Sequence, residues 1–377
     1  MATHKTNQVD FLPAGFYPDL SKVRRVLVIK MRNHGDVLLS SPVFDALRKK
    51  LPAAQIDAYV YLDTLPMLEG HPAIGQFHLY DRNWKSQSAM KRYQKEYALL
   101  HAIRTAGYDL TINLTDGDRG TLSALYSGAR IRIGVEASGR GIPGKQRMVT
   151  HVAKRPPTSR HMVEQNLDAI RRIGIFPDRD ERRTSFFIPG AARNTVAQRL
   201  SQHGISGQGY LLIHPTSRWL FKAWPAKHVA ALIEALETTD CPVILSCGPD
   251  PRERSVLDEI KRFAQHTRII DLGGMLSLKE LGALIERARC LLCVDSVPMH
   301  MAAALRVPTV AIFGPSSESI WAPWDNPYAT IVSQNLSCQP CGLDGCGGSK
   351  RSDCLESLAV EPVLRAVRSK LAATLGP

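Results

Sequence analysis

The chain has 377 residues, which is long for one domain and makes two domains the natural expectation. Apolar residues account for 44%, yet no stretch approaches the roughly 20 consecutive apolar residues of a membrane span. Lys and Arg outnumber Asp and Glu by 48 to 35, so a net charge of +13 indicates either an anionic partner or an ordinary solvated basic surface. We expect no nucleic-acid partner, because no nucleic-acid motif appears and the basic residues are spread along the chain.

The first residues, Met1 to Leu20, are mixed and polar and lack the apolar core and cleavage site of a signal peptide. We therefore expect a protein that stays in the cytoplasm, where disulfides are not expected.

The first half of the chain alternates strand and helix signals, which predicts a mostly parallel sheet covered by helices. The expected strands are Arg25 to Ile29, Ile56 to Tyr61, Gln76 to Tyr80, Leu110 to Leu114 and Ile131 to Val135. The expected helices are Val37 to Leu51, Lys91 to Ala106, Gly120 to Tyr126 and His161 to Ile173. Between the last strand and the last helix, Ser138 to Arg160 is rich in Gly, Pro, Ser and basic residues and is expected to be a long loop.

A charged, Pro-containing stretch from Pro177 to Thr184 is expected to link two domains. A second alternating series follows it. The expected strands are Tyr210 to His214, Val243 to Cys247, Ile269 to Leu272, Cys290 to Val294 and Thr309 to Phe313. The expected helices are Ala226 to Leu236, Glu253 to Phe263, a helix opened by the capping box Ser277 to Glu280, His300 to Leu305 and Pro362 to Ala373.

This pattern predicts an α/β protein of two doubly wound, Rossmann-like domains that face a central cleft. We expect the N-terminal domain over residues 1–180 and the C-terminal domain over residues 185–356. Residues 357–377 hold the last helix, and one hypothesis is that it packs back on the N-terminal domain.

The most informative segment reads K-M-R-N-H-G-D from Lys30 to Asp36, between the first strand and the first helix. A loop at the carboxyl end of the first strand is where an α/β domain presents chemistry. Asp36 is therefore a candidate catalytic group. The alternative is that Asp36 only caps the helix and offsets its dipole.

In the second half, His214 to Pro225 joins a strand to a helix and contains Thr216, Ser217 and Lys222. Hydroxyls, a helix N-terminus and a lysine together suit a phosphate or diphosphate. It is not a Walker loop, because the Gly spacing is absent. An ordinary loop with a surface lysine is the alternative.

Two further strand ends carry polar residues. Asp295 and Ser296 follow a strand and start a helix, with His300 one turn on, whereas Asp250 follows the Gly248 turn and is a candidate for binding ribose hydroxyls. The alternatives are helix caps for Asp295 and Ser296 and a satisfied, partly buried side chain for His300. Together with Asp36 opposite, the three strand ends suit glycosyl transfer from a nucleotide sugar.

Two groups of residues raise the question of a metal. Asp116 and Asp118 have metal-clamp spacing but lie in the first half, away from the expected donor loops, and are interpreted as loop or acceptor contacts. Cysteines in a Gly-rich loop form the other group, for which a structural metal site and four free thiols are both open. This group consists of Cys338, Cys341, Cys346 and Cys354.

From Val26 through Pro323 the chain resembles the heptosyltransferases of glycosyltransferase family 9, which build the inner core of lipopolysaccharide. K-M-R-N-H-G-D-V-L-L is similar to the family's opening motif, T-S-R…K-A-W-P resembles its diphosphate loop, and V-D-S-V-P-M-H resembles its Asp-(Ser/Thr)-x-x-x-His motif. Where the family often has Thr-Gly after the Asp, this chain has Ser296-Val297.

The resemblance implies the GT-B fold and inverting transfer, without a metal or other cofactor, from ADP-L-glycero-β-D-manno-heptose. Asp36 would be the general base, and Lys222 would offset charge on the leaving ADP. The remaining donor contacts would be Thr216, Ser217, Asp250, Asp295, Ser296 and His300.

On the acceptor side, the resemblance implies a phosphorylated lipid A-core acceptor, reached by peripheral contact with the cytoplasmic face of the inner membrane. Arg119 and Arg130 are candidates to meet its phosphates, with ordinary surface charge as the alternative.

Other classes of function remain open on the sequence. They are a family 9 transferase with a different acceptor or nucleotide sugar, a nucleotide-sugar epimerase or hydrolase of similar fold, and a non-catalytic binder of anionic glycolipid. A NAD enzyme is not expected, because no G-x-G-x-x-G follows a strand.

Overall fold

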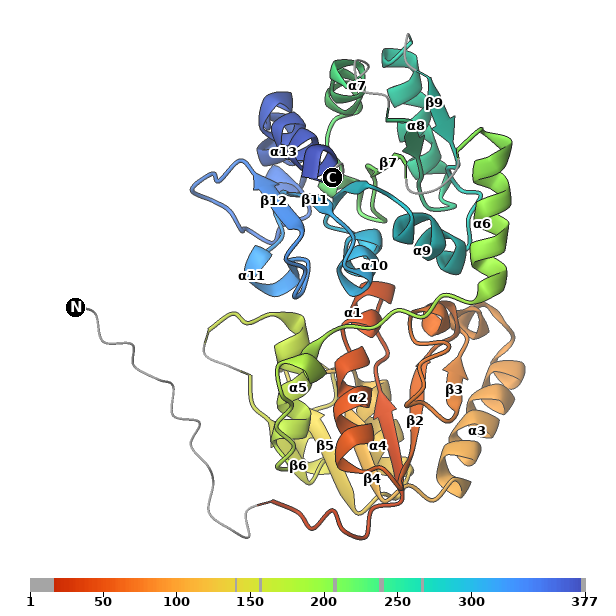
Figure 1. Ribbon diagram of the computed structural model, residues 1–377. Coiled ribbons are helices and arrows are strands. Elements are labelled where there is room, and N and C mark those ends of the chain that lie inside the picture. Colours follow the sequence, from red (N-terminus) through yellow and green to blue (C-terminus); the bar gives the residue numbers. More distant parts are fainter. Residues whose placement is uncertain are drawn as a thin grey trace, which may run out of the picture.

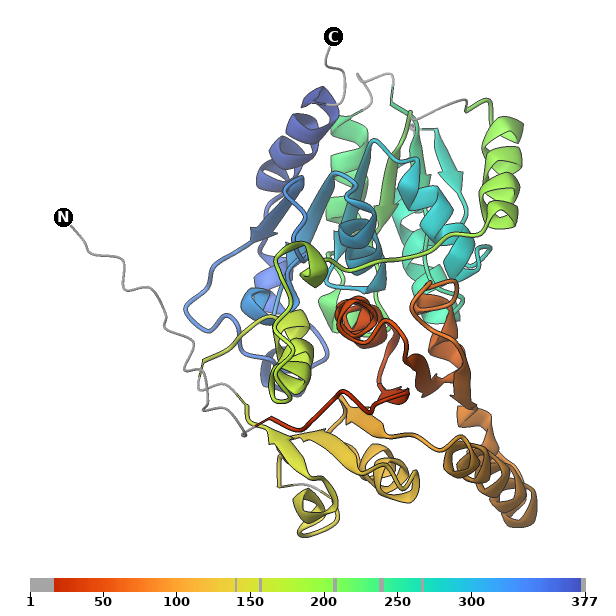
Figure 2. The same cartoon turned by 60° about the horizontal axis from the view of Figure 1, so that its bottom comes forward.

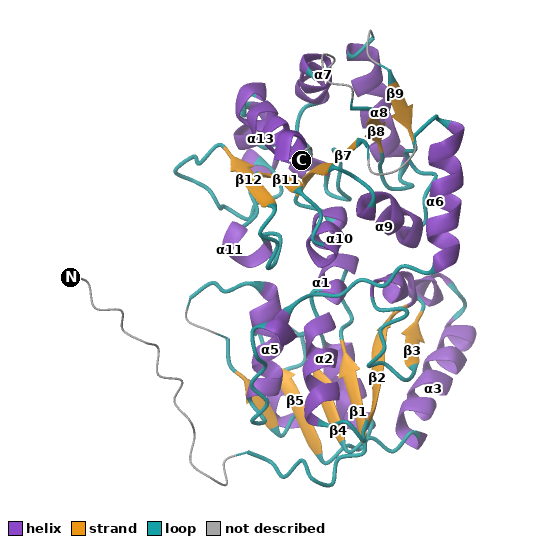
Figure 3. Ribbon diagram, in the orientation of Figure 1, coloured by secondary structure: helices purple, strands orange, loops and turns teal. Residues whose placement is uncertain are grey.

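A computed structural model describes residues 17–139, 141–155, 158–205, 209–236, 241–265 and 268–373. The chain forms two domains, each built on a six-stranded parallel sheet with helices on both faces (Figures 1 and 3). The strand orders are β3-β2-β1-β4-β5-β6 and β12-β11-β10-β7-β8-β9. The prediction of two doubly wound α/β domains is confirmed.

The N-terminal sheet consists of β1 (Arg25–Ile29), β2 (Gln55–Tyr61), β3 (Phe77–Tyr80), β4 (Leu110–Asn113), β5 (Ile131–Val135) and β6 (His151–Ala153). Its helices are α1 (His34–Leu38), α2 (Ser41–Lys50), α3 (Ala89–Thr105), α4 (Asp118–Tyr126) and α5 (Met162–Arg171). Short 3-10 segments are η1 (Leu62–Met67), η2 (Arg82–Ser86), η3 (Lys145–Met148) and η4 (Asp180–Arg182). Helices α2 and α5 pack together over one face of the sheet, and α3 and α4 pack together over the other (Figures 1 and 2).

The helix expected from Val37 to Leu51 is in fact two helices, α1 and α2, which part at Leu39 and Ser40. Pro42 lies in the first turn of α2. A proline there cannot donate to the carbonyl four residues earlier and would clash with it, so one continuous helix is excluded. The Ser40 hydroxyl instead donates to the Val37 carbonyl at 2.6 Å. The break leaves α1 as a single short turn of helix at the cleft.

The C-terminal sheet consists of β7 (Leu211–His214), β8 (Val243–Leu245), β9 (Ile269–Asp271), β10 (Cys290–Val294), β11 (Thr309–Phe313) and β12 (Ala329–Ser333). Its helices are α6 (Gly190–Gln202), α7 (Ala226–Ala235), α8 (Pro251–Phe263), α9 (Leu278–Glu286), α10 (Val297–Leu305), α11 (Glu318–Trp321), α12 (Asp353–Glu356) and α13 (Val360–Ala373). Two 3-10 segments, η5 (Leu220–Lys222) and η6 (Cys346–Gly348), complete it. The predicted capping box at the start of α9 is confirmed, with Ser277 and Glu280 bonding reciprocally.

Besides short helical segments, the sequence pattern missed the strands β6 and β12 and the helix α6 among the described residues. The expected loop from Ser138 to Arg160 contains η3 and the edge strand β6, which is only three residues long and pairs with β5. Strand β12 is partly buried along its whole length and so lacks an alternation of buried and exposed positions. Helix α6 buries only Ala192, Val196 and Leu200, a stripe too thin to stand out from its polar surroundings.

The last helix, α13, packs on the C-terminal domain, which corrects the hypothesis that it returns to the N-terminal one. Val363, Leu364 and Val367 are buried in the cluster formed by α7 and strands β10 and β11. The Arg368 guanidinium donates to the Ala235 carbonyl at the end of α7, 2.8 Å away. The apolar stripe of α13 covers the open face of this sheet, where a solvent-exposed core would otherwise remain.

The two domains share one apolar cluster that runs from α1 through the linker to α10. Leu38 of α1, Ile188 of the linker and Met299 of α10 belong to it. Lys279 of α9 adds a polar tie, since its ammonium donates to the carbonyls of Glu69 (2.8 Å) and Phe187 (2.6 Å). Burial lowers the pKa of Lys279 to about 8. The carboxyl ends of the two sheets therefore meet across a packed junction (Figure 1).

Candidate active site

In each parallel sheet the order in which successive strands are added reverses between two neighbouring strands, β1 and β4 in one sheet and β7 and β10 in the other. At such a switch point the loops diverge above and below the sheet and leave a crevice where α/β proteins bind ligands. The candidate residues of the sequence follow β1, β7, β8 and β10. The topology thus brings most of them to two facing crevices.

Asp36 lies in α1, directly beyond β1, and is 8% exposed. The N-cap of this helix is Asn33, so Asp36 is not the capping residue, although it still favours the positive end of the helix dipole. Its carboxylate lies 3.7 Å from the Arg32 Nε atom. Asp36 lines a cavity of about 540 Å³ in the N-terminal domain. The acid is therefore largely buried in the wall of a half-open pocket.

Lys30 is a candidate site residue that the sequence analysis did not single out, although it begins the K-M-R-N-H-G-D segment. Its ammonium is buried in the same cavity and donates to the Asn166 side-chain oxygen (2.8 Å) and the Leu114 carbonyl (3.2 Å). Burial lowers the pKa of Lys30 to about 8, and the nearby Asp36 carboxylate opposes that shift. Lys30 directly follows the apolar run of β1, and this position was a signal in the sequence. A lysine buried without a partner is costly, so a lysine at the end of a buried strand is expected to have a specific partner or ligand.

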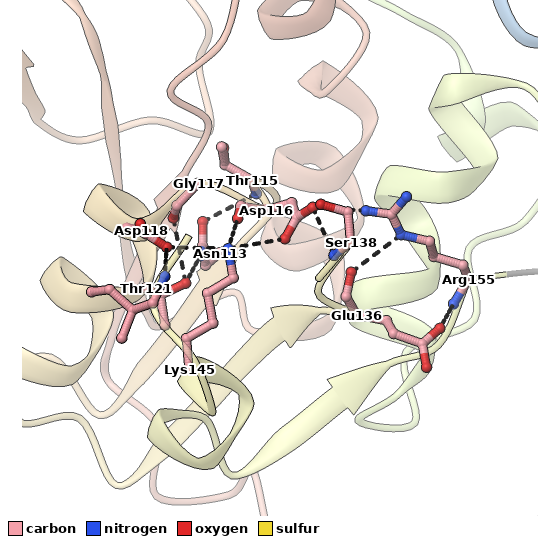
Figure 4. A network of polar contacts seen from close by, with 11 residues as sticks. Asn113, Thr115, Asp116, Gly117, Asp118, Thr121, Glu136, Ser138, Lys145 and Arg155 are labelled. Carbon is pink, nitrogen blue, oxygen red and sulfur yellow. Dashed lines mark hydrogen bonds and ion pairs between the residues drawn. The ribbon is translucent and has the colours of Figure 1, made fainter. Parts of the chain in front are cut away.

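The opposite wall of the cavity is basic and includes Lys154 and Arg155. Figure 4 shows how this wall is held. The Arg155 guanidinium pairs with the Asp116 carboxylate at 2.8 Å, and the buried Lys145 ammonium pairs with both Asp116 (3.3 Å) and Asp118 (3.2 Å). Backbone N–H groups of Ser138 and Ile142 also donate to these carboxylates.

The two carboxylates at 116 and 118 therefore organise the loop after β5. Although burial acts in the opposite direction, hydrogen bonds from Ser138 and Lys145 hold the pKa of Asp116 below its ordinary value. The backbone N–H of Ile142, together with Lys145, lowers the pKa of Asp118. This agrees with the interpretation of Asp116 and Asp118 as loop contacts, and Asp116 also lines the cavity.

Arg119 and Arg130, the two candidates for the acceptor phosphates, do not line the cavity around Asp36, and their part in acceptor binding stays a prediction. Arg119 lies over the Tyr80 ring, 3.9 Å from its centroid, and pairs with Glu96 of α3 at 3.3 Å. Arg130 is exposed and directly precedes β5, so it lies at the amino edge of the sheet, the length of that strand away from the cleft. The sequence indicated basic residues near the site, but it could not determine at which edge of the sheet Arg130 lies.

On the other side of the cleft, Lys222 and Asp295 form an ion pair. The Lys222 ammonium lies 2.6 Å from the Asp295 carboxylate oxygen, and Asp295 is buried directly beyond β10. The partners are 73 residues apart in sequence, so only the fold joins them. The Lys222 ammonium keeps two further N–H donors for a ligand.

Thr216 is buried and donates its hydroxyl to Glu253 at 2.6 Å. The same carboxylate accepts from the backbone N–H of Gly248 at 3.2 Å. Glu253 therefore ties the loop after β7 to the loop after β8, a function that the sequence did not reveal. The Ser217 hydroxyl contacts the backbone of Trp219, donating to its carbonyl at 2.9 Å. Thr216 thus supports the shape of the loop more directly than it offers a free hydroxyl.

Asp250 and Ser296 both lie at helix starts, where their alternative interpretation as caps applies. Asp250 caps α8 by accepting from the Arg252 N–H, and its pairing with the Arg252 side chain lowers its pKa to about 2. Ser296 is the N-cap residue of α10, but its hydroxyl donates to the Val294 carbonyl at 3.2 Å instead of capping the helix.

His300 lies in α10, where this helix contacts α1 of the N-terminal domain. It is 4% exposed, and its Nδ1 atom has no hydrogen-bond partner among the described residues. A methyl group on Gly35 would come within 2.9 Å of the His300 ring, so α1 and α10 touch at this point. Burial lowers the pKa of His300, while the carboxylates of Asp295 and Asp36 oppose the shift. Carboxylates of both domains therefore act on the pKa of this ring. Because its Nδ1 atom has no hydrogen-bond partner among the described residues, His300 is not a buried histidine with all its hydrogen bonds made.

The four clustered cysteines lie around a small cavity of about 90 Å³ in the C-terminal tail. All four are free thiols, and burial raises the pKa of Cys354 to about 11. Among the described residues, no three His, Cys, Asp or Glu side chains are arranged to hold a metal ion. The same tail supports the loop after β7, because the Ser352 hydroxyl donates to the Phe221 carbonyl at 2.6 Å.

Two doubly wound domains that meet at the carboxyl ends of their sheets are the architecture of the GT-B class of glycosyltransferases. Two solved structures share this fold. The glycosyl transferase family 9 protein from Veillonella parvula DSM 2008 superimposes with a TM-score of 0.80 over 93% of this chain and 98% of its own, at 21% identity. E. coli ADP-heptose lps heptosyltransferase II gives a TM-score of 0.71 over 93% of this chain and 100% of its own, at 20% identity.

The family model of glycosyltransferase family 9 (heptosyltransferase) matches residues 96–348, and the chain belongs to this family. Two E. coli proteins, each named lipopolysaccharide heptosyltransferase 3, are 33% identical to it. The first match covers 78% of this chain and 85% of the relative, and the second, from strain K12, covers 82% and 88%. The protein is therefore a glycosyltransferase. Among the described residues, no helix has the length and apolar character needed to cross a bilayer.

Proposed function

We propose that the protein transfers L-glycero-D-manno-heptose from ADP-L-glycero-β-D-manno-heptose to a heptose of the lipopolysaccharide inner core. Its relatives of 33% identity are both lipopolysaccharide heptosyltransferase 3 proteins, and the N-H-G-D and D-S-V-P-M-H segments and the Cys-rich tail favour the same reaction. The observation that carries the proposal is the pair of half-sites that meet at His300. Gly35, which precedes Asp36, contacts that ring, and Asp295 of the Lys222–Asp295 ion pair comes two residues before the helix that carries it.

In the proposed reaction, Asp36 accepts the proton of the acceptor hydroxyl as that oxygen attacks the anomeric carbon of the donor. A single carboxylate is sufficient for a displacement with inversion, because the nucleophile and the leaving group lie on opposite sides of the reacting carbon. The cavity beside Asp36 holds the acceptor sugar. Asp36 is only 8% exposed, so an acceptor bound in the cavity would displace the little solvent that reaches the carboxylate.

The leaving ADP develops negative charge at the diphosphate, and in the proposed site Lys222 offsets it. A preorganised cation in a site that excludes water stabilises such charge more than a cation in solution would. Asp295 holds the ammonium in place and contacts the donor heptose. Ser217, the backbone N–H groups at the start of α10, and Asp250 at the start of α8 complete the proposed grip on ADP.

We assign the acceptor's phosphate to the basic wall of the cavity, at Lys154 and Arg155, in place of Arg119 and Arg130. Arg155 is about half exposed and is held by Asp116, so its guanidinium is oriented but still accessible. A guanidinium can meet a phosphate through two parallel hydrogen bonds. An acceptor of this kind belongs to the cytoplasmic face of the inner membrane, where we place the enzyme.

Product analysis tests this proposal. The purified protein is incubated with ADP-heptose and a series of defined, truncated core acceptors, and the products are characterised by mass spectrometry and by the NMR signature of the new anomeric centre. We expect one added heptose of inverted configuration on an acceptor that already carries inner-core heptose.

The other classes of function predict different products. Release of free heptose without acceptor would indicate a hydrolase, and conversion of the donor alone would indicate an epimerase. Transfer from a different nucleotide sugar would retain the family and change the donor. Donor binding with no turnover on any acceptor would contradict the proposed reaction.

A further inference from the structure

Helix α3 carries a second apolar stripe that faces away from the protein core. Leu99 and Ile103 pack inward against the sheet. Met90, Tyr93 and Tyr97 point the other way and are 67%, 67% and 53% exposed. Their spacing of three and four residues places them on one face of the helix. The Tyr93 and Tyr97 rings stack with their centroids 6.3 Å apart, so the exposed aromatic surface is ordered.

Helix α4 extends the same surface. It packs beside α3, and its outward residues Leu122, Leu125 and Tyr126 are each more than two-fifths exposed. A hollow of about 470 Å³ lies between the two helices. Figure 2 shows α3 and α4 on the outer side of the N-terminal sheet, away from the C-terminal domain. Large apolar side chains that gather on one exposed face indicate an interaction site.

Cations surround these apolar side chains. Lys91, Arg92 and Lys95 occupy the first turns of α3, and Lys85 precedes them in η2. All four are exposed, and neither Lys91 nor Arg92 has an ion-pair partner among the described residues. The single acid in this helix, Glu96, is already engaged by Tyr80 and Arg119. The surface therefore combines tyrosines with uncompensated positive charge.

We propose that the outer face of α3 and α4 docks the protein on an anionic lipid bilayer. Tyrosine rings favour the level of the lipid headgroups, and lysines and arginines beside them are attracted to negatively charged lipid. At an anionic bilayer the apolar side chains would be removed from water and the neighbouring cations would be attracted to the lipid headgroups.

The position of this face suits the proposed function, on which the biological meaning of the docking rests. Helix α4 begins at Asp118, two residues beyond Asp116 in the wall of the acceptor cavity. A bilayer against α3 and α4 would bring a lipid-borne acceptor to that side of the cavity. Binding to lipid is nevertheless a property of the surface and can be measured without any substrate.

A second copy of the chain is a poorer occupant. A two-fold interface places the same patch on both subunits, so the unpaired cations of one α3 would face those of the other. Like charges brought together at an interface oppose association.

Vesicle co-sedimentation of the full chain tests the proposal. Vesicles of phosphatidylcholine mixed with phosphatidylglycerol are compared with vesicles of phosphatidylcholine alone, at low and high salt. We expect binding to the mixed vesicles, weak binding to the neutral ones, and a loss of binding in high salt because salt screens the attraction.

Two variants locate the surface. The double variant Lys91→Glu with Arg92→Glu should lower partition to anionic vesicles at least about tenfold, and Tyr93→Ser with Tyr97→Ser should lower it at all salt concentrations. The matched control is Arg262→Glu with Phe263→Ser on α8, where Phe263 is comparably exposed at 51%. Circular dichroism and thermal unfolding confirm that each variant is folded.

Four outcomes are informative. Loss of binding in the α3 variants but not in the α8 control supports the proposal. Equal binding by all variants, no binding to anionic vesicles, or a patch-dependent dimer seen by light scattering overturns it. Transfer to a deacylated, soluble acceptor is measured in parallel and should be unchanged in the α3 variants. If that transfer is absent in the parent protein, the proposed function fails independently of the lipid result.

Discussion

The two sides of the cleft differ in how their polar groups are satisfied. On the N-terminal side, Asp36 and the basic wall line a cavity of about 540 Å³, and their partners Arg32 and Asp116 leave that space unfilled. On the C-terminal side, the polar groups are engaged with one another, as in the Lys222–Asp295 and Thr216–Glu253 pairs. One side is a preformed pocket, and the other is a set of loops whose charges hold each other. In the proposed reaction, a donor diphosphate would meet an ammonium that Asp295 already holds, whereas an acceptor would enter a space that already exists.

The largest effect should follow from Asp36→Asn, which removes the proposed base and keeps the shape of the side chain. We expect kcat to fall about a thousandfold, since positioned general bases contribute on that order. ADP affinity should be unchanged, because the change is on the other side of the cleft. Release of ADP measures kcat, and calorimetry measures binding.

The control for this prediction is Asp63→Asn, which alters an exposed carboxylate paired with Arg82. Activity of Asp36→Asn within a few fold of the parent would exclude Asp36 as the base and would leave the cavity as a binding site alone.

Lys222→Met should have the next largest effect, because it removes the cation and leaves Asp295 buried without its partner. We expect about a hundredfold lower kcat, the scale seen when one preorganised electrostatic contact is lost, together with weaker ADP binding. Lys227→Met on α7 is the matched control, since Lys227 is exposed and lies five residues on. Unchanged ADP affinity in Lys222→Met would show that the diphosphate binds elsewhere.

Arg155→Ala tests the acceptor side and should be smaller in effect. We expect KM for a phosphorylated acceptor to rise about tenfold, the cost of one charge-assisted contact, with kcat little changed. A dephosphorylated acceptor should show no such rise. Arg130→Ala at the amino edge of the sheet is the comparison, and an equal rise in KM for that variant would restore Arg130 to the site.

The smallest effect concerns the junction that holds the two sides together. His161 caps α5, stacks on Trp324 with ring centroids 4.4 Å apart, and donates through Nε2 to the Ala322 carbonyl at 2.9 Å. Burial lowers the pKa of His161 to about 4. Between about pH 6.5 and pH 4, His161 is protonated in the unfolded chain but neutral in the folded one. The free energy of unfolding therefore decreases as the pH falls through this range.

This contribution of His161 is at most about 3 kcal/mol. The variant His161→Asn retains a side chain that can cap α5 and should lose part of the acid dependence. Chemical denaturation at a series of pH values measures it. His214, whose pKa burial also lowers to about 4, should account for a similar share in both proteins. An identical pH dependence in parent and variant would contradict the prediction.

The regular elements were largely predictable because each is encoded locally. The strands next to the site are short apolar runs, and the residue types at their ends are those that bind phosphate and move protons. The failures occur where the local signal is weak, as in the three-residue strand β6, or where a local preference overrides the periodicity, as at Pro42 between α1 and α2.

The amino-acid sequence alone determined the two doubly wound domains, the family, and most of the polar residues at the strand ends, because apolar periodicity and motif spacing are local properties of the chain. Only the tertiary structure decided which of those residues meet. It joined Lys222 to Asp295 and brought Gly35 against His300. It also excluded Arg130 from the cleft and placed Arg155 there. The reason is physical: the edge of a sheet to which a side chain belongs, and its partner across a cleft, depend on contacts between residues far apart in sequence.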